Sequence, residues 1–187
     1  MRQRHLLLLG TAMVLLAGAS TVGLATASGA FRGGSLAPDG QCSAPALSGT
    51  VVDVTLTNMG GAMMGGSMMG GPMMGGMMGI RLSTDRAPAG TVSFRVANTG
   101  GLVHELVVLP LPDGQSVGAR AVQSDGRVDE VGSLGEASRT CGAGTGGGID
   151  PGAIGWVTLN LPAGNYELVC NFPWHYAAGM HAGLTVS

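Results

Sequence analysis

Residues 166–180 read Tyr166-Glu167-Leu168-Val169-Cys170-Asn171-Phe172-Pro173-Trp174-His175-Tyr176-Ala177-Ala178-Gly179-Met180, and this stretch decides how the rest of the chain is understood. Its first five residues have the two-residue period of a β-strand, which directs Tyr166, Leu168 and Cys170 toward the interior. Pro173 and Gly179 favour turns, so a loop is expected after Cys170. The loop has the spacing C-x4-H-x4-M, which returns a histidine and a methionine toward the cysteine.

A second histidine lies upstream, in a segment that also has the period of a strand. Alternation along this segment places His104 on the same face as Leu102, Leu106 and Val108. A buried imidazole needs a polar partner, because an unpaired polar group in an apolar interior is costly. We therefore expect His104 to meet Cys170 across a sandwich of strands.

With the loop, this histidine completes a set of one thiolate, two imidazoles and one thioether. The members are His104, Cys170, His175 and Met180. This is the ligand set of a blue-copper site, in which two His and one Cys form a trigonal plane with a weak axial Met. Sulfur ligands favour Cu(I) and imidazoles hold Cu(II), so one mononuclear copper can cycle between the two states. The alternative is a buried or disulfide-bonded Cys170, with His175 and Met180 as ordinary loop residues.

At these residues the sequence resembles the cupredoxin family of small blue-copper proteins, and its loop is similar to that of the rusticyanin, sulfocyanin and auracyanin branches. The resemblance covers roughly residues 50–187 and includes the strand that leads into the loop. It implies a Greek-key β-sandwich and gives the four ligand roles to the residues named above. Three features depart from the relatives: Trp174 stands where they usually have Gly, Glu105 stands where many have Asn or Ser, and a Met-rich stretch is inserted.

The same loop argues against related copper enzymes. A binuclear copper centre needs two cysteines in the loop, and only Cys170 is present. A multicopper oxidase needs paired His-x-His motifs for a trinuclear cluster, which four histidines in the whole chain cannot supply. We therefore expect a protein that is not an enzyme.

Outside this loop, the chain reads as short strands separated by Gly and Pro, without a long helical period. The expected strands are residues 50–57, 80–83, 91–97, 102–109, 155–161, 166–170 and 182–186. They predict an all-β Greek-key sandwich or barrel of about seven or eight strands. Residues 110–150 are interpreted as a long loop excursion, with one short helix near residues 127–139.

The N-terminus has the pattern of an export signal. Two arginines precede an apolar run, and Ala25-Thr26-Ala27 has the small-x-small pattern of a cleavage site. Cleavage gives a signal peptide of residues 1–27; the alternative is an uncleaved anchor, because 22 uncharged residues form about 33 Å of helix. An arm, residues 28–49, then precedes the cupredoxin domain, residues 50–187. In both cases the domain is exported, to the periplasm, the extracellular space or the outer face of the cytoplasmic membrane.

The length and net charge of the chain exclude other classes of protein. A chain of 187 residues is one domain's worth once a leader is removed. Nine basic against eleven acidic residues give a net charge of −2, which leaves no basic surface for phosphates and excludes nucleic acid as a partner. A membrane is a partner only if the N-terminal segment stays uncleaved.

The methionines are unusually concentrated in one segment, because nine of the twelve fall between Met59 and Met78. Residues 59–79 repeat Gly-Gly-x-Met-Met, and this much glycine predicts a flexible loop. Thioethers can capture extra Cu(I), and the candidates are Met63, Met64, Met68, Met69, Met73, Met74, Met77 and Met78. Two alternatives stay open: a repeat expansion in a surface linker, and an adaptable docking patch of Met.

Cys42 and Cys141 remain as an even pair. In an oxidising compartment a structural disulfide between them is expected, with free thiols as the alternative. The bridge would tie the N-terminal arm to the excursion.

The function expected from these residues is transfer of single electrons between two redox proteins that dock transiently. Phe172, Trp174 and Tyr176 flank His175 and are expected to form the docking surface, because a small contact lets partners leave quickly. The alternative is a copper-handling or copper-resistance protein that captures Cu(I) on the Met-rich loop. A third possibility is a metal-free adhesion module, which the ligand set disfavours.

Overall fold

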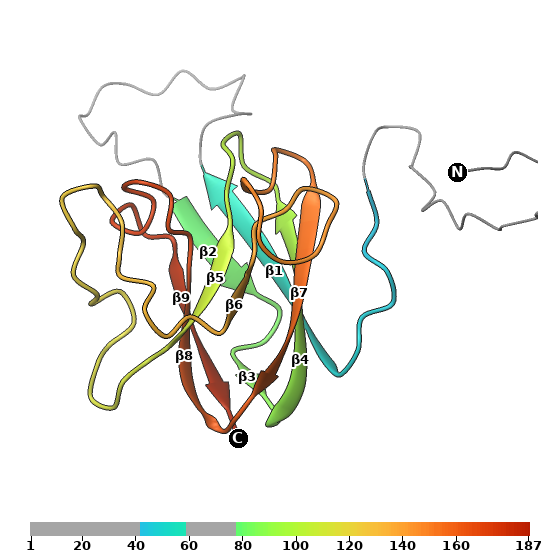
Figure 1. The fold of residues 1–187 in the computed structure, drawn as a ribbon, viewed down its shortest axis with the longest axis horizontal. Helices are drawn as coiled ribbons and strands as arrows, with labels where there is room; N and C mark the ends of the chain where they lie inside the picture. Colours follow the sequence, from blue (N-terminus) through green and yellow to red (C-terminus); the bar gives the residue numbers. More distant parts are fainter. Residues whose placement is uncertain (1–41, 59–77) are drawn as a thin grey trace, which may run out of the picture. The chain divides into compact units, whose positions relative to one another are not determined.

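The computed structural model describes residues 42–58 and 78–187, and these residues form strands and no helix (Figure 1). The strands are β1 (Thr50–Asn58), β2 (Met78–Leu82), β3 (Arg86–Ala87), β4 (Gly90–Asn98), β5 (Leu106–Pro110), β6 (Gly135–Ala137), β7 (Ile154–Leu161), β8 (Gly164–Val169) and β9 (His181–Val186). The prediction of an all-β fold is confirmed, with nine strands in place of the seven or eight expected.

The strands form two sheets that pack face to face. One sheet has the order β2-β1-β4-β7, and the other has the order β3-β9-β8-β5-β6. Most neighbours are antiparallel, while β1 pairs parallel with β4 and β3 pairs parallel with β9. The ends of β1 and β8 and the start of β5 lie at the same end of the sandwich, uppermost in Figure 1. We call this the upper end.

Alternating apolar residues fill the space between the sheets. In β1, Val52, Val54 and Leu56 are buried, while the residues between them are exposed or half-buried. Phe94 of β4 and Leu168 of β8 belong to the same core cluster. Each fully buried side chain of this size contributes about 1.5–3 kcal/mol, so the alternation is enough to fix which face of each strand points inward.

A second apolar cluster lies on the outer face of the β5–β8 pair. It consists of Val107, Leu109, Val128, Val169 and Tyr176. Val128 belongs to the excursion, which covers this face, so β5 and β8 are buried on both sides. The inward direction predicted for Tyr166, Leu168 and Cys170 is confirmed, because all three belong to the core between the sheets.

The strand predicted over residues 102–109 is too long. It begins only at Leu106, and Leu102 is 46% exposed although it was expected inside. The reason is that the side chains of Asn58 and Asn98 bind the backbone before His104 and hold it as a loop.

The helix predicted near residues 127–139 is also wrong, since the described residues of this segment contain β6 instead. Gly132 and Gly135 both have positive φ angles, which an α-helix cannot contain. The strands β3 and β6 were missed because two or three residues are too few for a two-residue period to be recognised.

The expected disulfide between Cys42 and Cys141 is present and joins residues 99 apart in the sequence. It ties residues 42–49, the described part of the N-terminal arm, to the excursion. In the chain-entropy model, closing a loop of this length stabilises the fold by roughly 4–5 kcal/mol.

Two expectations concern residues outside the described part of the chain. They are the signal peptide or anchor, residues 1–27, and methionines 63–77 of the Met-rich segment. Met78 and Gly79, the last two residues of the predicted insertion, belong to β2. Among the described residues, no helix has the length and apolar character needed to cross a membrane.

Candidate metal centre

The pairing of β8 with β9 fixes both ends of the loop after Cys170. The two strands pair antiparallel up to the loop, and the Cys170 N–H then donates to the Met180 carbonyl at 3.1 Å. Within the loop, the Met180 N–H donates to the His175 carbonyl at 3.1 Å. Gly179 has a φ of 102°, a region that favours glycine. The sheet therefore brings Cys170, His175 and Met180 together at the upper end.

His104 reaches this place from the start of β5. Its backbone exchanges two hydrogen bonds with Ile149, at 3.2 Å and 2.7 Å, and its side chain is completely buried. Because β5 pairs with β8, the His104 ring lies beside Cys170, with Nδ1 3.8 Å from Sγ. The prediction that His104 and Cys170 meet is confirmed.

Three donor atoms converge with the spacing that a metal ion needs. The Cys170 Sγ lies 3.3 Å from the His175 Nδ1, and the Nδ1 atoms of His104 and His175 lie 3.2 Å apart. Donors in a trigonal plane, with bonds of about 2.0 Å to nitrogen and 2.3 Å to sulfur, stand roughly 3.5–3.7 Å apart. Two imidazoles and a thiol therefore fit copper in both chemistry and spacing.

Met180 is the fourth candidate ligand. It is completely buried and belongs to the same core cluster as Cys170. Its backbone is hydrogen-bonded to both Cys170 and His175. A thioether shielded from water in this position is available as a weak, soft donor.

Burial also sets the protonation of the metal-free site. It lowers the pKa of His104 to about 4, with a further lowering by His175, and it lowers the pKa of His175. Burial raises the pKa of the Cys170 thiol to about 12. At neutral pH both imidazoles are therefore uncharged and free to bind a metal, whereas the thiol must lose its proton when a metal binds.

The sulfur of Cys170 is enclosed by a second layer of polar contacts. The Glu105 N–H donates to Sγ at 3.4 Å, and the buried Glu105 carboxylate accepts the Asn171 N–H at 3.2 Å. Burial and the charges of Glu136 and Glu130 raise the pKa of Glu105 to about 7. The Asn171 side chain in turn donates to Glu130 at 2.6 Å. The residues on either side of the candidate ligands are thus fixed by hydrogen bonds.

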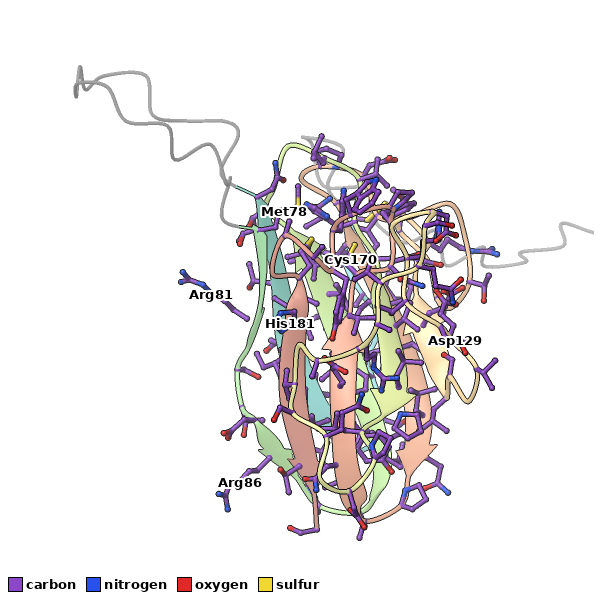
Figure 2. All side chains as sticks on the ribbon, turned by 90° about the vertical axis from the view of Figure 1, so that its left-hand side faces the viewer. Met78, Arg81, Arg86, Asp129, Cys170 and His181 are labelled. Carbon is purple, nitrogen blue, oxygen red and sulfur yellow. A yellow bond between two sulfur atoms is a disulfide. The ribbon has the colours of Figure 1, made fainter. Side chains whose placement is uncertain are left out.

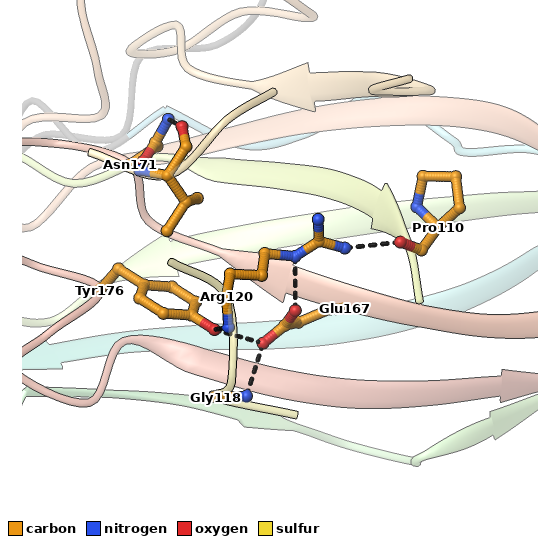
Figure 3. Close-up of polar contacts among 7 residues, drawn as sticks. Pro110, Gly118, Arg120, Glu167, Asn171 and Tyr176 are labelled. Carbon is orange, nitrogen blue, oxygen red and sulfur yellow. Dashed lines mark hydrogen bonds and ion pairs between the residues drawn. The ribbon is translucent and has the colours of Figure 1, made fainter. Parts of the chain in front are cut away.

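A buried ion pair holds the other side of the loop (Figure 3). Arg120 of the excursion donates through Nε to the Glu167 carboxylate at 2.6 Å, and the Glu167 side chain is completely buried. The same carboxylate accepts the Tyr176 hydroxyl at 2.9 Å and the Gly118 N–H at 2.7 Å. Tyr176 follows His175 directly, so the excursion, β8 and the loop are joined at one carboxylate.

The aromatic residues around His175 differ in exposure. Trp174 is 60% exposed and has a φ of 71°, an unusual conformation for a bulky residue. Phe172 is half-buried, with the Arg127 guanidinium 5.9 Å above its ring. Tyr176, which was expected on the surface, is only 3% exposed because its hydroxyl reaches the buried Glu167. Of the three aromatic residues expected to form the docking surface, Trp174 is therefore exposed and Phe172 half-buried, whereas Tyr176 is buried.

Comparison with protein families identifies the chain. A model of the sulfocyanin (SoxE) domain matches residues 76–187, more than half of the chain. The protein belongs to the sulfocyanin family. The cupredoxin resemblance seen in the loop is thereby confirmed, and the cofactor of this sulfocyanin domain is copper. No curated protein matches the chain.

Several solved structures are similar to the sulfocyanin domain. Auracyanin from Roseiflexus castenholzii is 18% identical, with a TM-score of 0.44, over 76% of this chain and 99% of that one. Auracyanin A, a "blue" copper protein from Chloroflexus aurantiacus, is 16% identical, with a TM-score of 0.41, over 73% and 99%. Rusticyanin from Thiobacillus ferrooxidans is 23% identical, with a TM-score of 0.42, over 75% and 79%. The assignment to the sulfocyanin family depends on the family model and not on these overlaps.

Several residues of this sulfocyanin site had no signal in the sequence. Asn58, Arg120 and Asn171 contact the candidate ligands or their neighbours only because distant segments fold together. Glu167 carried a weak signal, as a carboxylate in a strand that leads directly to the cysteine.

Removing the guanidinium from the buried ion pair should destabilise the domain strongly. We expect Arg120→Met to lower the free energy of unfolding by about 3–5 kcal/mol, because the Glu167 carboxylate is left charged and buried. Denaturant unfolding of the copper-free protein measures this. The matched control is Arg95→Met, which breaks an ion pair with Asp53 whose side chains are 50% exposed, and it should lower the free energy of unfolding far less. Equal losses of unfolding free energy in the two variants would contradict the structural role given to Arg120.

Proposed function

We propose that this sulfocyanin carries single electrons through one copper ion held by His104, Cys170, His175 and Met180. The observation that supports this best is the convergence of the Cys170 Sγ with the two Nδ1 atoms, all within 3.8 Å of one another. Copper, when bound, supplies one reversible oxidation step. A buried thiolate and thioether favour the reduced state, while two neutral imidazoles favour the oxidised state.

The protein's contribution is a rigid set of donors. Three sets of hydrogen bonds hold these donors in place. They join the two ends of the loop to each other, His104 to Ile149, and Tyr176 to Glu167. Ligand atoms that move little between the two oxidation states of the metal lower the reorganisation energy of each electron transfer. This rigidity supports an electron carrier, and no second cluster of candidate metal ligands lies among residues 42–58 and 78–187 to support catalysis.

We further propose that electrons enter and leave beside His175. His175 is half-buried, whereas His104 is completely buried, so His175 lies nearer to a partner at the upper end. Trp174, which precedes it in the loop, is exposed, and so are the apolar residues Leu102 and Val103 just before His104. A small apolar contact of this kind suits transient redox partners.

The proposed location is outside the cytoplasm. The Cys42–Cys141 disulfide supports this, because structural disulfides persist mainly in oxidising compartments. The export-signal pattern at the N-terminus points the same way.

Copper handling remains a second candidate, and one structural observation favours it. The Met-rich segment joins Asn58 to Met78, which face each other in the β1–β2 pair. A Cβ atom built on Gly179 would lie 3.1 Å from the Met78 carbonyl, so this strand end borders the ligand loop. Figure 2 shows Met78 and Cys170 at the same end of the sandwich. Cu(I) captured by the segment would therefore be delivered close to the site.

The ligand assignment is tested by two substitutions. Cys170→Ser should abolish the intense blue charge-transfer absorption while the domain still folds, because the thiolate is lost. Met180→Leu should keep the blue absorption and raise the reduction potential, because loss of a weak axial donor destabilises Cu(II) more than Cu(I). Visible and electron paramagnetic resonance spectra with redox titration measure both effects. A Cys170→Ser protein that stays blue would refute the assignment.

The docking surface is tested by electron self-exchange, which needs no knowledge of the partner. Trp174→Gly should slow self-exchange about tenfold, equivalent to about 1.4 kcal/mol of docking free energy, and should leave copper affinity nearly unchanged. Glycine accepts the positive φ at this position, so the loop should keep its shape. The control is Val131→Ser, which removes a side chain 86% exposed on the excursion. Self-exchange that is unaffected by Trp174→Gly would contradict this docking surface.

Copper handling is tested by shortening the Met-rich segment. Because Asn58 and Met78 pair directly, residues 59–77 can be replaced by a two-residue Asn-Gly turn. The blue site should remain, since all four proposed ligands are retained. If the segment captures copper, Cu(I) bound per chain should fall from several to one, and cells should become less copper-tolerant. One Cu(I) bound per chain both before and after the segment is shortened would exclude this second function.

A further inference from the structure

Asn58, the last residue of β1, contacts a proposed copper ligand from a distant part of the chain. Its Oδ1 atom lies 3.0 Å from the His104 Nε2 atom. The same oxygen accepts the backbone N–H of Gly101 at 2.8 Å and that of Leu102 at 3.2 Å. One side-chain oxygen therefore joins β1, the loop before His104 and the imidazole ring.

These contacts determine which nitrogen of the ring carries hydrogen. Backbone N–H groups can only donate, so the Asn58 atom that receives two of them must be the oxygen and not the amide nitrogen. This oxygen has no hydrogen to give, so the His104 Nε2 must be the N–H donor. The ring is completely buried, and a neutral imidazole carries only one hydrogen. Nδ1 therefore holds the free lone pair.

The free lone pair belongs to the nitrogen that faces the other donors. The His104 Nδ1 lies 3.2 Å from the His175 Nδ1 and 3.8 Å from the Cys170 Sγ. Asn58 thus selects the tautomer that can bind a metal at this point. A hydrogen-bond acceptor behind a ligating imidazole also makes that ligand more basic.

Gly100 provides the space for this contact. A Cβ atom at Gly100 would lie 2.0 Å from the Asn58 Oδ1 and 3.0 Å from the His104 Nε2. The Gly100 N–H is held by the Asn98 Oδ1 at 2.9 Å, which fixes the loop over the contact. Any larger residue at position 100 would push the amide away from the imidazole.

We propose that Asn58 is a positioning residue for the copper site, which fixes the His104 tautomer and raises its basicity, and that Gly100 is required for this contact. The inference rests on the proposed function in that it takes His104 as a copper ligand. Removal of Asn58 should leave Nδ1 partly protonated and less basic, which weakens Cu(II) binding more than Cu(I) binding.

The experiment begins with nitrogen NMR of the histidine side chains in the metal-free protein. In the wild type, His104 should be a single Nε2–H tautomer whose proton exchanges slowly with water. In Asn58→Ala we expect a mixture of tautomers, a Cu(II) affinity about 10- to 100-fold lower and a higher reduction potential. Asn58→Asp keeps an acceptor oxygen, so it should restore the tautomer and lower the potential below that of the wild type.

Two glycine substitutions separate this contact from general loss of structure. Gly100→Ala should reproduce the Asn58→Ala changes. Gly147→Ala is the control, because a Cβ there meets nothing within 4 Å, and it should change neither the tautomer nor the potential.

The role of Asn58 would be overturned by an Nδ1–H tautomer in the metal-free wild type. It would equally be overturned if Asn58→Ala shifted the tautomer without changing copper affinity or potential. Failure of the proposed function is seen separately, as a blue Cys170→Ser protein, because the tautomer is read without copper.

Discussion

The hydrogen bond from the Cys170 N–H to the Met180 carbonyl is the constraint on which the upper end of the sandwich depends. It extends the β8–β9 ladder by one step, so the loop leaves and re-enters the sheet at neighbouring points. A loop with such closely spaced ends must turn back on itself, and this brings His175 over the cysteine. The apolar cores on both faces of β8 hold this ladder in place.

The excursion is the main departure from a plain sandwich. It covers the outer face of β5 and β8, and it supplies Arg120 to the buried Glu167 and Val128 to Asn171. Ile149, near its end, holds the backbone of His104. Residues that lack any regular period in the sequence therefore enclose the candidate site on two sides.

Much of the fold and the candidate ligands could be predicted, because each left a local pattern. The C-x4-H-x4-M spacing and the alternation around Cys170 are contained within fifteen residues, and the core strands show a clear period of two. The contact of Asn58 with His104 could not be predicted, since it depends on how β1 ends beside a loop 46 residues away. Tyr176 was predicted to be exposed but is buried, because its hydroxyl donates to the Glu167 carboxylate. That carboxylate becomes buried only when the excursion covers β8.

The distribution of the proposed ligands along the chain has a consequence for the order of assembly. Cys170, His175 and Met180 lie close together in sequence and can meet as soon as the β8–β9 hairpin closes. His104 joins them only after β5 has paired with β8 across the whole excursion, a contact of high sequence separation that forms slowly. Three of the proposed ligands are therefore local in sequence, whereas the buried imidazole joins them through the contact of greatest sequence separation.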